Sequence, residues 1–377
     1  MGLSRYRLGD LIEICEEKND DLQYGIEDVK GISIQKIFID TKANMEGVSL
    51  KPYYLVQPDD FVYVTVTSRN GEKITLAHNV TEKTYIVSSS YIVFKVKKTD
   101  LLLSDYLFMY FNRPEFDRYS RYNSWGSARE TFGWSDMCAI EIDLPPLDIQ
   151  QKYVDVYNAM IANQQCYERG LEDLKLAFDA LIDNYKHSSE KKNVYSILKE
   201  VDSRNVDESI TDVQGINITK QFMPSVANTN GVDISKYKIV KKGQFAFSGM
   251  QTGRDKCIRI ALFDKDEPVI ISPAYSVFEM KDNTVLAEYI MMWFSRKEVD
   301  RLGWFASDAS IRTNLDMERF YEMEIPIPSI EIQQSIVDIY KLYLQRKAIN
   351  ERLKEHIKSI CPILIKGSLE EARKKEV

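Results

Sequence analysis

The sequence predicts an α+β protein with two similar globular domains, separated by a long antiparallel two-helix coiled coil and related by a pseudo-two-fold axis. Two observations predict this fold. The chain of 377 residues repeats itself, so that a unit of about 180 residues occurs twice in tandem. Each unit also ends in a long segment whose apolar residues step by four and three, which is the spacing of a coiled-coil seam.

The repeat consists of matching segments at a nearly constant offset. A single change of one residue in the offset, which falls between residues 39 and 106, aligns all the matching segments. Chance agreement is therefore excluded as an explanation. The pairs are Asp28–Ile39 with Asp212–Met223, Tyr106–Phe111 with Tyr289–Phe294, and Pro145–Gln151 with Pro328–Gln334.

The first part of each unit mixes short β-rich runs with turn signals. In the first unit, Tyr53–Val66 reads as two strands around a Pro-Asp turn, and Ile74–Ala77 and Tyr85–Val96 add further strands. Ser104–Tyr110 reads as a short helix with the serine as its N-cap. This pattern is typical of an α+β globule.

The second part of each unit is predicted to be one long helix of about 38 residues, or about 57 Å. Polar residues interrupt both seams, at Asn163 in the first and at Arg346 and Asn350 in the second, and such residues fix the register of a coiled coil. Pro362 is expected to kink or end the second helix, with Gly367 opening a separate short segment.

These parts give four regions along the chain. Residues 1–143 and 191–324 are the predicted globular domains, and residues 144–190 and 325–377 are the predicted helical spacers. Because the order is globule, helix, globule, helix, the second helix can return beside the first in the antiparallel direction.

Composition places the protein in the cytoplasm. The longest apolar runs, such as Ile290–Phe294, are far shorter than the roughly 20 residues that cross a bilayer, so no membrane partner is expected. The N-terminus lacks the apolar core of a secretory signal. The five cysteines are scattered, which favours reduced thiols over a disulfide framework or a zinc ribbon.

Two similar domains at a fixed spacing match the geometry needed to read two half-sites on duplex DNA. Since the domains differ in sequence, the half-sites should differ too. A scaffold whose duplicated domains bind protein fits the same geometry. The net charge of −7 argues mildly against an isolated DNA binder, although a partner subunit can supply positive charge.

The layout resembles the DNA specificity subunit of type I restriction–modification systems over essentially the whole chain. The resemblance rests on Leu144–Gln151 and Ile325–Gln334, which lead into the long helices and are similar to an Ile-Pro-Leu-Pro-Pro-Leu-Glu-Glu-Gln signature. This chain departs from that signature mildly, with Asp148-Ile149 and Glu331-Ile332 before the glutamine pairs.

The resemblance implies that the globular domains are target recognition domains for double-stranded DNA. It implies that the helices dock two adenine-N6 methyltransferase subunits, which in turn recruit restriction subunits. A specificity subunit of a methylation-only or type II-like system would look the same. No cofactor is expected.

One candidate DNA-binding segment is the polar loop before each proline-rich stop, with Ser127 and Arg129 in the first unit and Ser310 and Arg312 in the second. It resembles the loop that approaches DNA in family members. Arginine suits bidentate contact with guanine or a phosphate clamp, and serine suits phosphate oxygens. The alternative is a loop that merely caps a helix of its own domain.

A second candidate is a strand-ending turn rich in glycine, cations and long polar side chains. Glycine lets the backbone approach the duplex, glutamine or asparagine can read adenine, and arginine can read guanine. A solvated hairpin tip is the alternative. The candidate residues are Arg69, Asn70 and Lys73 in the first unit and Gln251, Thr252, Arg254 and Lys256 in the second.

No catalytic constellation is visible in the sequence. It contains no Asn/Asp-Pro-Pro-Tyr/Phe methyltransferase motif and no phosphate loop, and the three histidines stand apart from any metal-ligand spacing. Lys36 and Lys220, at equivalent positions, are weaker candidates for phosphate clamps. The pairs Gln150-Gln151 and Gln333-Gln334 are expected to cap the helix ends locally, and capping of a partner interface is the alternative.

Overall fold

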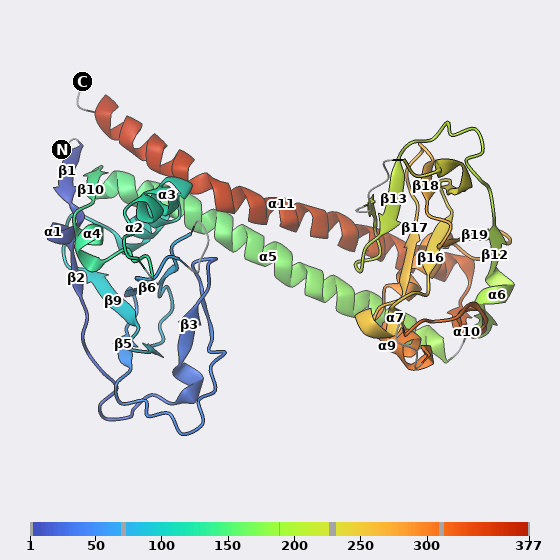
Figure 1. Ribbon diagram of the computed structural model, residues 1–377, viewed down its shortest axis with the longest axis horizontal. Coiled ribbons are helices and arrows are strands. Elements are labelled where there is room, and N and C mark those ends of the chain that lie inside the picture. Colours follow the sequence, from blue (N-terminus) through green and yellow to red (C-terminus); the bar gives the residue numbers. More distant parts are fainter. Residues whose placement is uncertain are drawn as a thin grey trace. The chain divides into compact units, whose positions relative to one another are not determined.

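A computed structural model describes residues 3–68, 73–127, 129–187, 189–225, 231–308 and 313–375. The chain divides into two compact units (Figure 1). The first unit contains Met1–Cys166 and Ile349–Val377, and the second contains Tyr167–Ala348. Each unit therefore holds one globular domain together with a part of both long helices.

The two domains contain equivalent strands in the same order, and among the described residues the second has one additional short helix between its sixth and seventh strands. In the first domain the elements are β1 (Ser4–Arg7), α1 (Leu8–Leu11), β2 (Ile12–Ile14), β3 (Lys30–Ile32), β4 (Phe38–Asp40), β5 (Tyr54–Val56), β6 (Phe61–Val64), β7 (Leu76–His78), β8 (Tyr85–Val87), β9 (Tyr91–Val96), α2 (Ser104–Phe111), α3 (Pro114–Tyr122), α4 (Trp134–Cys138) and β10 (Glu141–Leu144). In the second they are β11 (Glu190–Asn193), α6 (Val194–Ile197), β12 (Leu198–Val201), β13 (Val213–Ile216), β14 (Phe222–Pro224), β15 (Lys238–Val240), β16 (Phe245–Ser248), α7 (Thr252–Asp255), β17 (Arg259–Leu262), β18 (Val269–Ile271), β19 (Ser276–Met280), α8 (Ala287–Phe294), α9 (Lys297–Ala306), α10 (Met317–Glu322) and β20 (Glu324–Ile327). Single-turn 3-10 helices lie at Ile26–Asp28 and Ile234–Lys236.

Each domain is built on a four-stranded antiparallel sheet. The strand order is β2-β9-β6-β7 in the first domain and β12-β19-β16-β17 in the second. Smaller strands pair beside it, as β3-β4 and β5-β8 in the first domain and as the sheet β14-β13-β18-β15 in the second. The predicted α+β class and the duplication are therefore confirmed at the level of individual strands.

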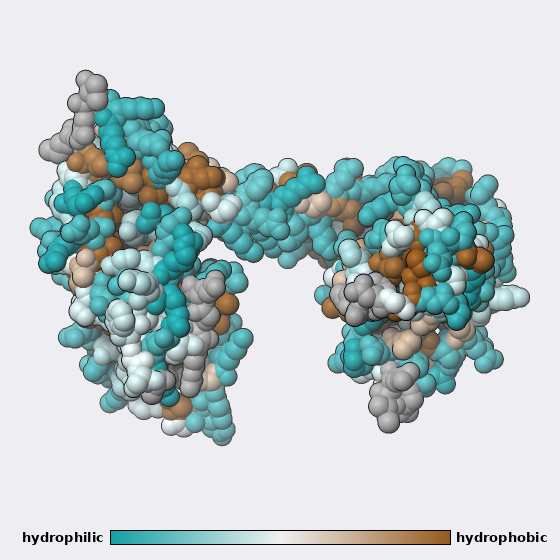
Figure 2. All heavy atoms as spheres, turned by 45° about the horizontal axis from the view of Figure 1, so that its top comes forward, coloured by the Kyte–Doolittle hydropathy of each residue, from teal (hydrophilic) through white to brown (hydrophobic). Residues whose placement is uncertain are grey.

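The core of each domain lies between its main sheet and the helices that follow it. In the first domain the buried rings of Phe61, Phe94 and Phe111 pack together, and in the second Phe247 stacks on Phe320 with ring centroids 3.9 Å apart. The visible surface is mostly hydrophilic, with local apolar patches (Figure 2).

A short sheet closes each domain before its long helix begins. Ser4–Arg7 pairs antiparallel with Glu141–Leu144, and Glu190–Asn193 pairs in the same way with Glu324–Ile327. The chain therefore enters and leaves each domain at neighbouring points.

The two long helices are α5 (Leu147–Lys186) and α11 (Ile330–Lys374). Within the first unit they pack antiparallel, since Lys152 forms an ion pair with Glu371 and Gln164 donates a hydrogen bond of 3.0 Å to Asn350. Within the second unit, Arg346 lies over the ring of Tyr167. The coiled-coil prediction is thus confirmed in each unit.

Three details of the helical prediction are wrong. The predicted seam of α5 passes through Val156 and Asn163, but both side chains are exposed. Tyr157 and Gln164, one position further along, are buried instead, so the seam is shifted by one residue there. The α11 helix does not end at Pro362 and no separate segment begins at Gly367, since the last turns of the same helix are anchored in the first core by Leu364, Ile365 and Ser368. In α2, Ser104 is the first helical residue, and Leu103 occupies the N-cap position without a side-chain cap.

A buried glutamine fixes the start of each long helix to its domain. Gln150 accepts a hydrogen bond from the amide of Leu103 and donates to the carbonyls of Leu101 and Pro145. Gln333 makes the equivalent bonds with Leu286, Thr284 and Pro328 in the second unit. The local bonding role expected for these glutamines is confirmed.

A buried lysine–aspartate pair occurs at the same place in both domains. The Nζ atom of Lys36 lies 2.8 Å from an oxygen of Asp117 and donates to the carbonyl of Phe111. Lys220 bonds to Asp300 and to the carbonyl of Phe294. Both lysines are buried, so the idea that they clamp phosphate is wrong.

We expect Lys36→Met to lower the free energy of unfolding of the first unit by about 3–5 kcal/mol, because it leaves the Asp117 carboxylate buried and unpaired. Lys220→Met should act similarly on the second unit. Urea unfolding of the full chain measures both. Lys242→Met, which breaks an exposed pair with Asp266, should leave the free energy of unfolding almost unchanged. Unchanged stability with weakened DNA binding would restore the phosphate-clamp hypothesis.

His78 is a buried polar residue of the first domain without a counterpart in the second. Its ring stacks on Phe61, with centroids 4.4 Å apart, and its nitrogens face Asp59 at 3.4 Å and Asp105 at 3.5 Å. Burial lowers the pKa of His78, although both carboxylates oppose the effect. At the equivalent position the second domain has Leu262.

Because the pKa of His78 is lowered on folding, the unfolded chain binds this proton more readily than the folded chain. Stability is therefore complete above the ordinary pKa of 6.5 and decreases as the pH falls below it. We expect His78→Leu to reduce this acid-induced loss in the first unit. Urea midpoints from about pH 8 to pH 5 measure it. An identical pH profile in the variant would contradict this role of His78.

Candidate nucleic-acid interface

In the second unit, the two segments that the sequence singles out as DNA-binding candidates lie against each other. The turn after β16 is joined to the segment that follows the polar loop by two backbone hydrogen bonds of 2.9 Å, from Gly253 to Thr313 and from Leu315 to Gly249. Asn314 accepts a further bond from the amide of Gln251. A side chain at residue 249 would meet the Leu315 carbonyl oxygen at 1.8 Å, so this close approach requires glycine.

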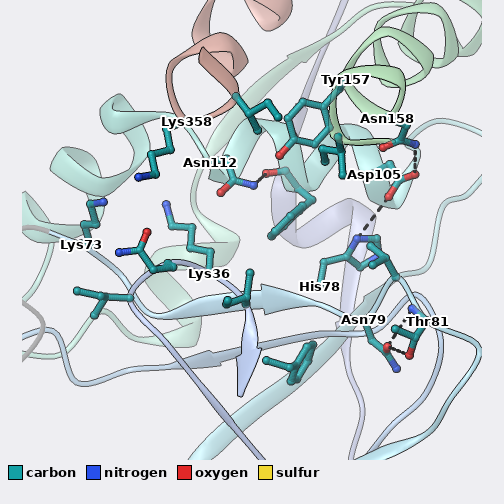
Figure 3. Close-up of a pocket in the computed structure, with 18 of the residues that line it drawn as sticks. Lys36, Lys73, His78, Asn79, Thr81, Asp105, Asn112, Tyr157, Asn158 and Lys358 are labelled. Carbon is teal, nitrogen blue, oxygen red and sulfur yellow. Dashed lines mark hydrogen bonds and ion pairs between the residues drawn. The ribbon is translucent and has the colours of Figure 1, made fainter. Parts of the chain in front are cut away.

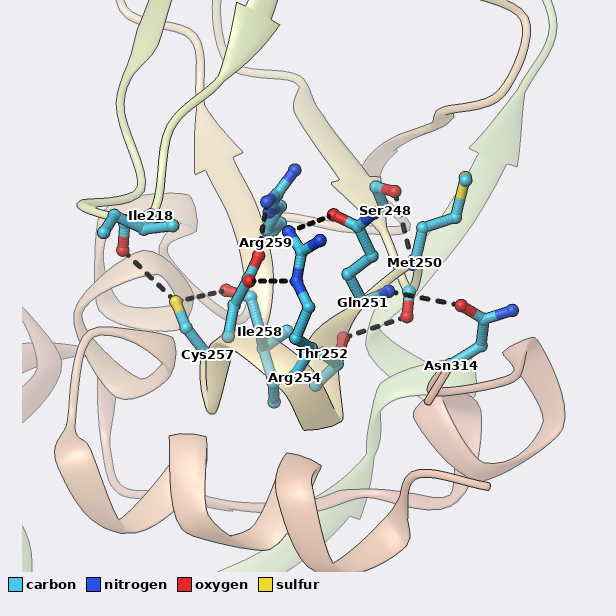
Figure 4. A network of polar contacts seen from close by, with 12 residues as sticks. Ile218, Ser248, Met250, Gln251, Thr252, Arg254, Cys257, Ile258, Arg259 and Asn314 are labelled. Carbon is cyan, nitrogen blue, oxygen red and sulfur yellow. Dashed lines mark hydrogen bonds and ion pairs between the residues drawn. The ribbon is translucent and has the colours of Figure 1, made fainter. Parts of the chain in front are cut away.

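Within this turn, the polar side chains form one network (Figure 4). Arg254 donates to Gln251 over 2.7 Å through one terminal nitrogen and to Asp255 over 2.9 Å through Nε. Its side chain is 63% exposed. The guanidinium is thus held in place while much of it remains open to solvent.

Asp255 is the anion that orients this network. Burial opposes its ionisation, but hydrogen bonds from Arg254 and Arg259 outweigh that effect and hold the pKa of Asp255 below its ordinary value. The carboxylate therefore stays charged at neutral pH and fixes both arginines. Sequence reasoning named Arg254 but missed Asp255 and Arg259.

The other two candidates in this turn differ in what they can contact. Thr252 is fully buried, and its hydroxyl donates to the carbonyl of Gly249, so it supports the turn. Lys256 places its Nζ atom 4.7 Å from the centre of the Trp304 ring. This cation–π pair joins the turn to the end of α9.

The first unit joins the equivalent segments. The amide of Thr67 donates to Glu130 over 2.9 Å, and the amide of Phe132 donates to Thr65 over 2.8 Å. Trp125 and Thr131 exchange two backbone bonds across the loop between them. Within this loop Ser127 and Arg129 are exposed. Four candidates, Arg69, Asn70, Ser310 and Arg312, lie outside the described residues.

Lys73 lines a cavity of about 940 Å³ in the first unit. Figure 3 shows Lys73, Lys36 and Lys358 with Asn112 at one end of the cavity and His78 at the other. The side chain of Lys73 therefore lies in the lining of this cavity, together with Lys36 and with Lys358 of α11.

Exposed aromatic rings border these segments in both units, and sequence reasoning did not identify them. Tyr122 and Trp125 lie at the end of α3 and just after it, and Trp304 and Phe305 lie at the end of α9. The available signal for Tyr122, Trp304 and Phe305 was their spacing from Phe116 and Val299, which places them on another face of the same helix, directly before the polar loops.

The described residues contain no group of three or more histidine, cysteine, aspartate or glutamate side chains that could hold a metal ion. No helix in this part of the chain is long and apolar enough to cross a membrane.

Comparison with known proteins identifies the family. The family model of the type I restriction modification DNA specificity domain matches residues 3–173 and again residues 185–359. No curated protein sequence matches the chain significantly.

Solved structures include chains of similar fold. The S subunit of a type I restriction–modification system from M. genitalium has a TM-score of 0.57 and 12% identity, over 99% of this chain and 96% of that one. A chain from a study of complex assembly and conformational transition of the type I R-M system has a TM-score of 0.49 and 13% identity, over 98% and 97%. The HsdS subunit from Thermoanaerobacter tengcongensis has a TM-score of 0.41 and 13% identity, over 98% and 96%.

The M. genitalium chain is similar in fold, and its identity is too low to carry more than that. The family assignment rests on the two matches of the domain model, which together cover most of the sequence. The chain therefore belongs to the type I restriction–modification DNA specificity family, with one copy of the domain in each half, and its role is the specific recognition of DNA.

Proposed function

We propose that this chain is the non-catalytic specificity subunit of a methyltransferase complex, and that each unit reads one half of an asymmetric, bipartite target in double-stranded DNA. One observation carries the proposal: both units join the same two chain segments at the same place in the fold, but with different side chains. The equivalent position of these segments in the two units is what reading two half-sites requires. Their different side chains suit half-sites of different base sequence.

In this proposal residues 1–143 and 191–324 are the target recognition domains, and residues 144–190 and 325–377 are the spacers. The short closing sheets lie close to these boundaries, since β10 ends at Leu144 and β20 at Ile327, which is three residues beyond the proposed end of the second domain.

The helices are proposed to dock two adenine-N6 methyltransferase subunits, which would recruit restriction subunits in the cytoplasm. Apolar side chains exposed on α5 and α11, among them Val156, Leu176, Leu342 and Ile363, support a protein-binding role for these helices. The net charge of −7 supports it as well, because a partner can supply the positive field that encloses DNA.

The first test is a genome-wide map of N6-methyladenine in cells with and without this chain. Loss of one asymmetric motif, consisting of two short half-sites around an unspecified gap, is expected on deletion. Replacing residues 191–324 with the second domain of another family member should then change one half of that motif, because each unit reads its own half-site.

Two outcomes would count against the proposal. A change in both halves after the exchange would exclude independent reading by the two units. If every methylated motif survived deletion of the gene in a strain with active methylation, a protein-binding scaffold would become the better explanation.

The turn after β16 allows a sharper prediction about single residues. Arg254→Ala should weaken binding of the target by about 1–3 kcal/mol and relax specificity in one half-site, since a pre-oriented guanidinium suits bidentate contact with guanine. Lys256→Ala should weaken binding to all sequences alike and lower the salt slope by about one. Fluorescence anisotropy of the complex with its methyltransferase subunits measures both.

Lys242→Ala is the matched control, because Lys242 is an exposed cation of the same domain that precedes β16, whereas the turn follows it. It should leave affinity and specificity unchanged. Equal effects of the three substitutions would show that general charge, rather than this turn, determines binding.

A further inference from the structure

The two most exposed aromatic rings among the described residues occupy equivalent positions. Tyr122 is 78% exposed and Phe305 is 86% exposed. Each lies five residues after the aspartate of the buried lysine pair, at Asp117 and Asp300 respectively. The duplication therefore preserves a large exposed ring at one point of the fold.

Helix packing does not require these rings. The α3 helix buries Phe116 and the α9 helix buries Val299 on another face. A large ring left in water forgoes roughly 1.5–3 kcal/mol of possible burial. One such ring is ordinary on a protein surface, but two at equivalent positions indicate a shared function.

Each ring has a second exposed aromatic beside it. Trp125, 65% exposed, follows Tyr122, and Trp304, 48% exposed, precedes Phe305. Lys256 lies over the Trp304 ring, so a cation from the candidate turn accompanies the aromatic pair. Aromatic rings interleaved with cations are characteristic of surfaces that stack on bases and neutralise phosphates.

The rings also lie at the junction of the two candidate segments. After Phe305 the chain turns at Ser307, whose hydroxyl bonds back to Gly303, and the α7 turn packs on this end of α9. After Tyr122, Ser124 bonds back to Ser120 in the same way. In both units the helix thus ends at the ring and the polar loop begins.

We propose that Tyr122 and Phe305 are wedge residues, each of which inserts its ring at a base step of its own half-site and stacks on the exposed base. This rests on the proposed function. The free energy lost when a base step is unstacked is offset by the additional protein surface that contacts the bent duplex. Insertion therefore favours pyrimidine–purine steps, which are flexible. The two residues would therefore add specificity through DNA deformability, without reading a base edge.

The test uses the full chain assembled with its methyltransferase subunits and a duplex carrying the mapped target. Permanganate oxidises thymines that have lost their stacking partners. The methyltransferase itself unpairs each methylated adenine, so the thymine opposite that adenine should react. In addition to this thymine, we expect permanganate to oxidise one further base step in each half-site. Phe305→Ala should abolish this further oxidation in one half, and Tyr122→Ala should abolish it in the other.

Affinity should fall about tenfold or more in each alanine variant, whereas Phe305→Trp and Tyr122→Phe, which keep a ring, should retain both affinity and permanganate reactivity. Tyr195→Ala is the control, because Tyr195 is a 62% exposed ring of the second unit that belongs to α6 and packs on Tyr321. It should bind and react as the wild type does.

Full reactivity and affinity in both alanine variants would overturn the proposal. So would a loss of complex assembly with unchanged DNA binding by the complexes that do form, since that outcome would make the rings a protein-docking surface. Failure of the wild-type complex to bind the mapped motif would instead count against the proposed function itself.

Discussion

The point at which each polar loop begins depends on one buried ion pair in the same domain. Lys36 ties its own turn to the end of α2 through the Phe111 carbonyl and to α3 through Asp117, and Asp117 also accepts the amide of Ile74. Lys220 and Asp300 repeat this arrangement with Ile258. Because α3 and α9 lead directly into the polar loops, the pair sets where each loop begins. Burying a charge in this way requires a complete set of partners, and the structure supplies it.

The glutamines at the start of the long helices act at the opposite end of α2 and α8. Gln150 and Gln333 satisfy partly buried backbone groups just before α2 and α8. They also hold the proline turn from which the helix departs. Each globular domain is therefore joined to the long helix that follows it by specific polar contacts as well as by the core.

Much of the fold could be predicted because the repeat shows each strand of the domain twice. The α11 seam, with Arg346 and Asn350, also follows the expected spacing. The failures have physical causes. The α5 register shifts where Gln164 meets Asn350, and partner contacts decide such a shift. Pro362 does not end α11, because tertiary packing beyond it outweighs local propensity. The burial of Lys36 could not be predicted from the sequence, because a lysine is expected at the surface and its buried partner, Asp117, lies 81 positions away.

The division of the chain between the two units has a consequence for the order of folding. The second unit is one continuous stretch, whereas the core of the first needs residues from the C-terminal helix, including Cys361, Leu364 and Ile365. The hydroxyl of Tyr106 bonds to that of Ser368, a contact that spans 262 positions. During synthesis the domain that is made first must therefore wait for the last segment of α11. The second unit, although it emerges later, can complete its core earlier, which reverses the usual order from N- to C-terminus.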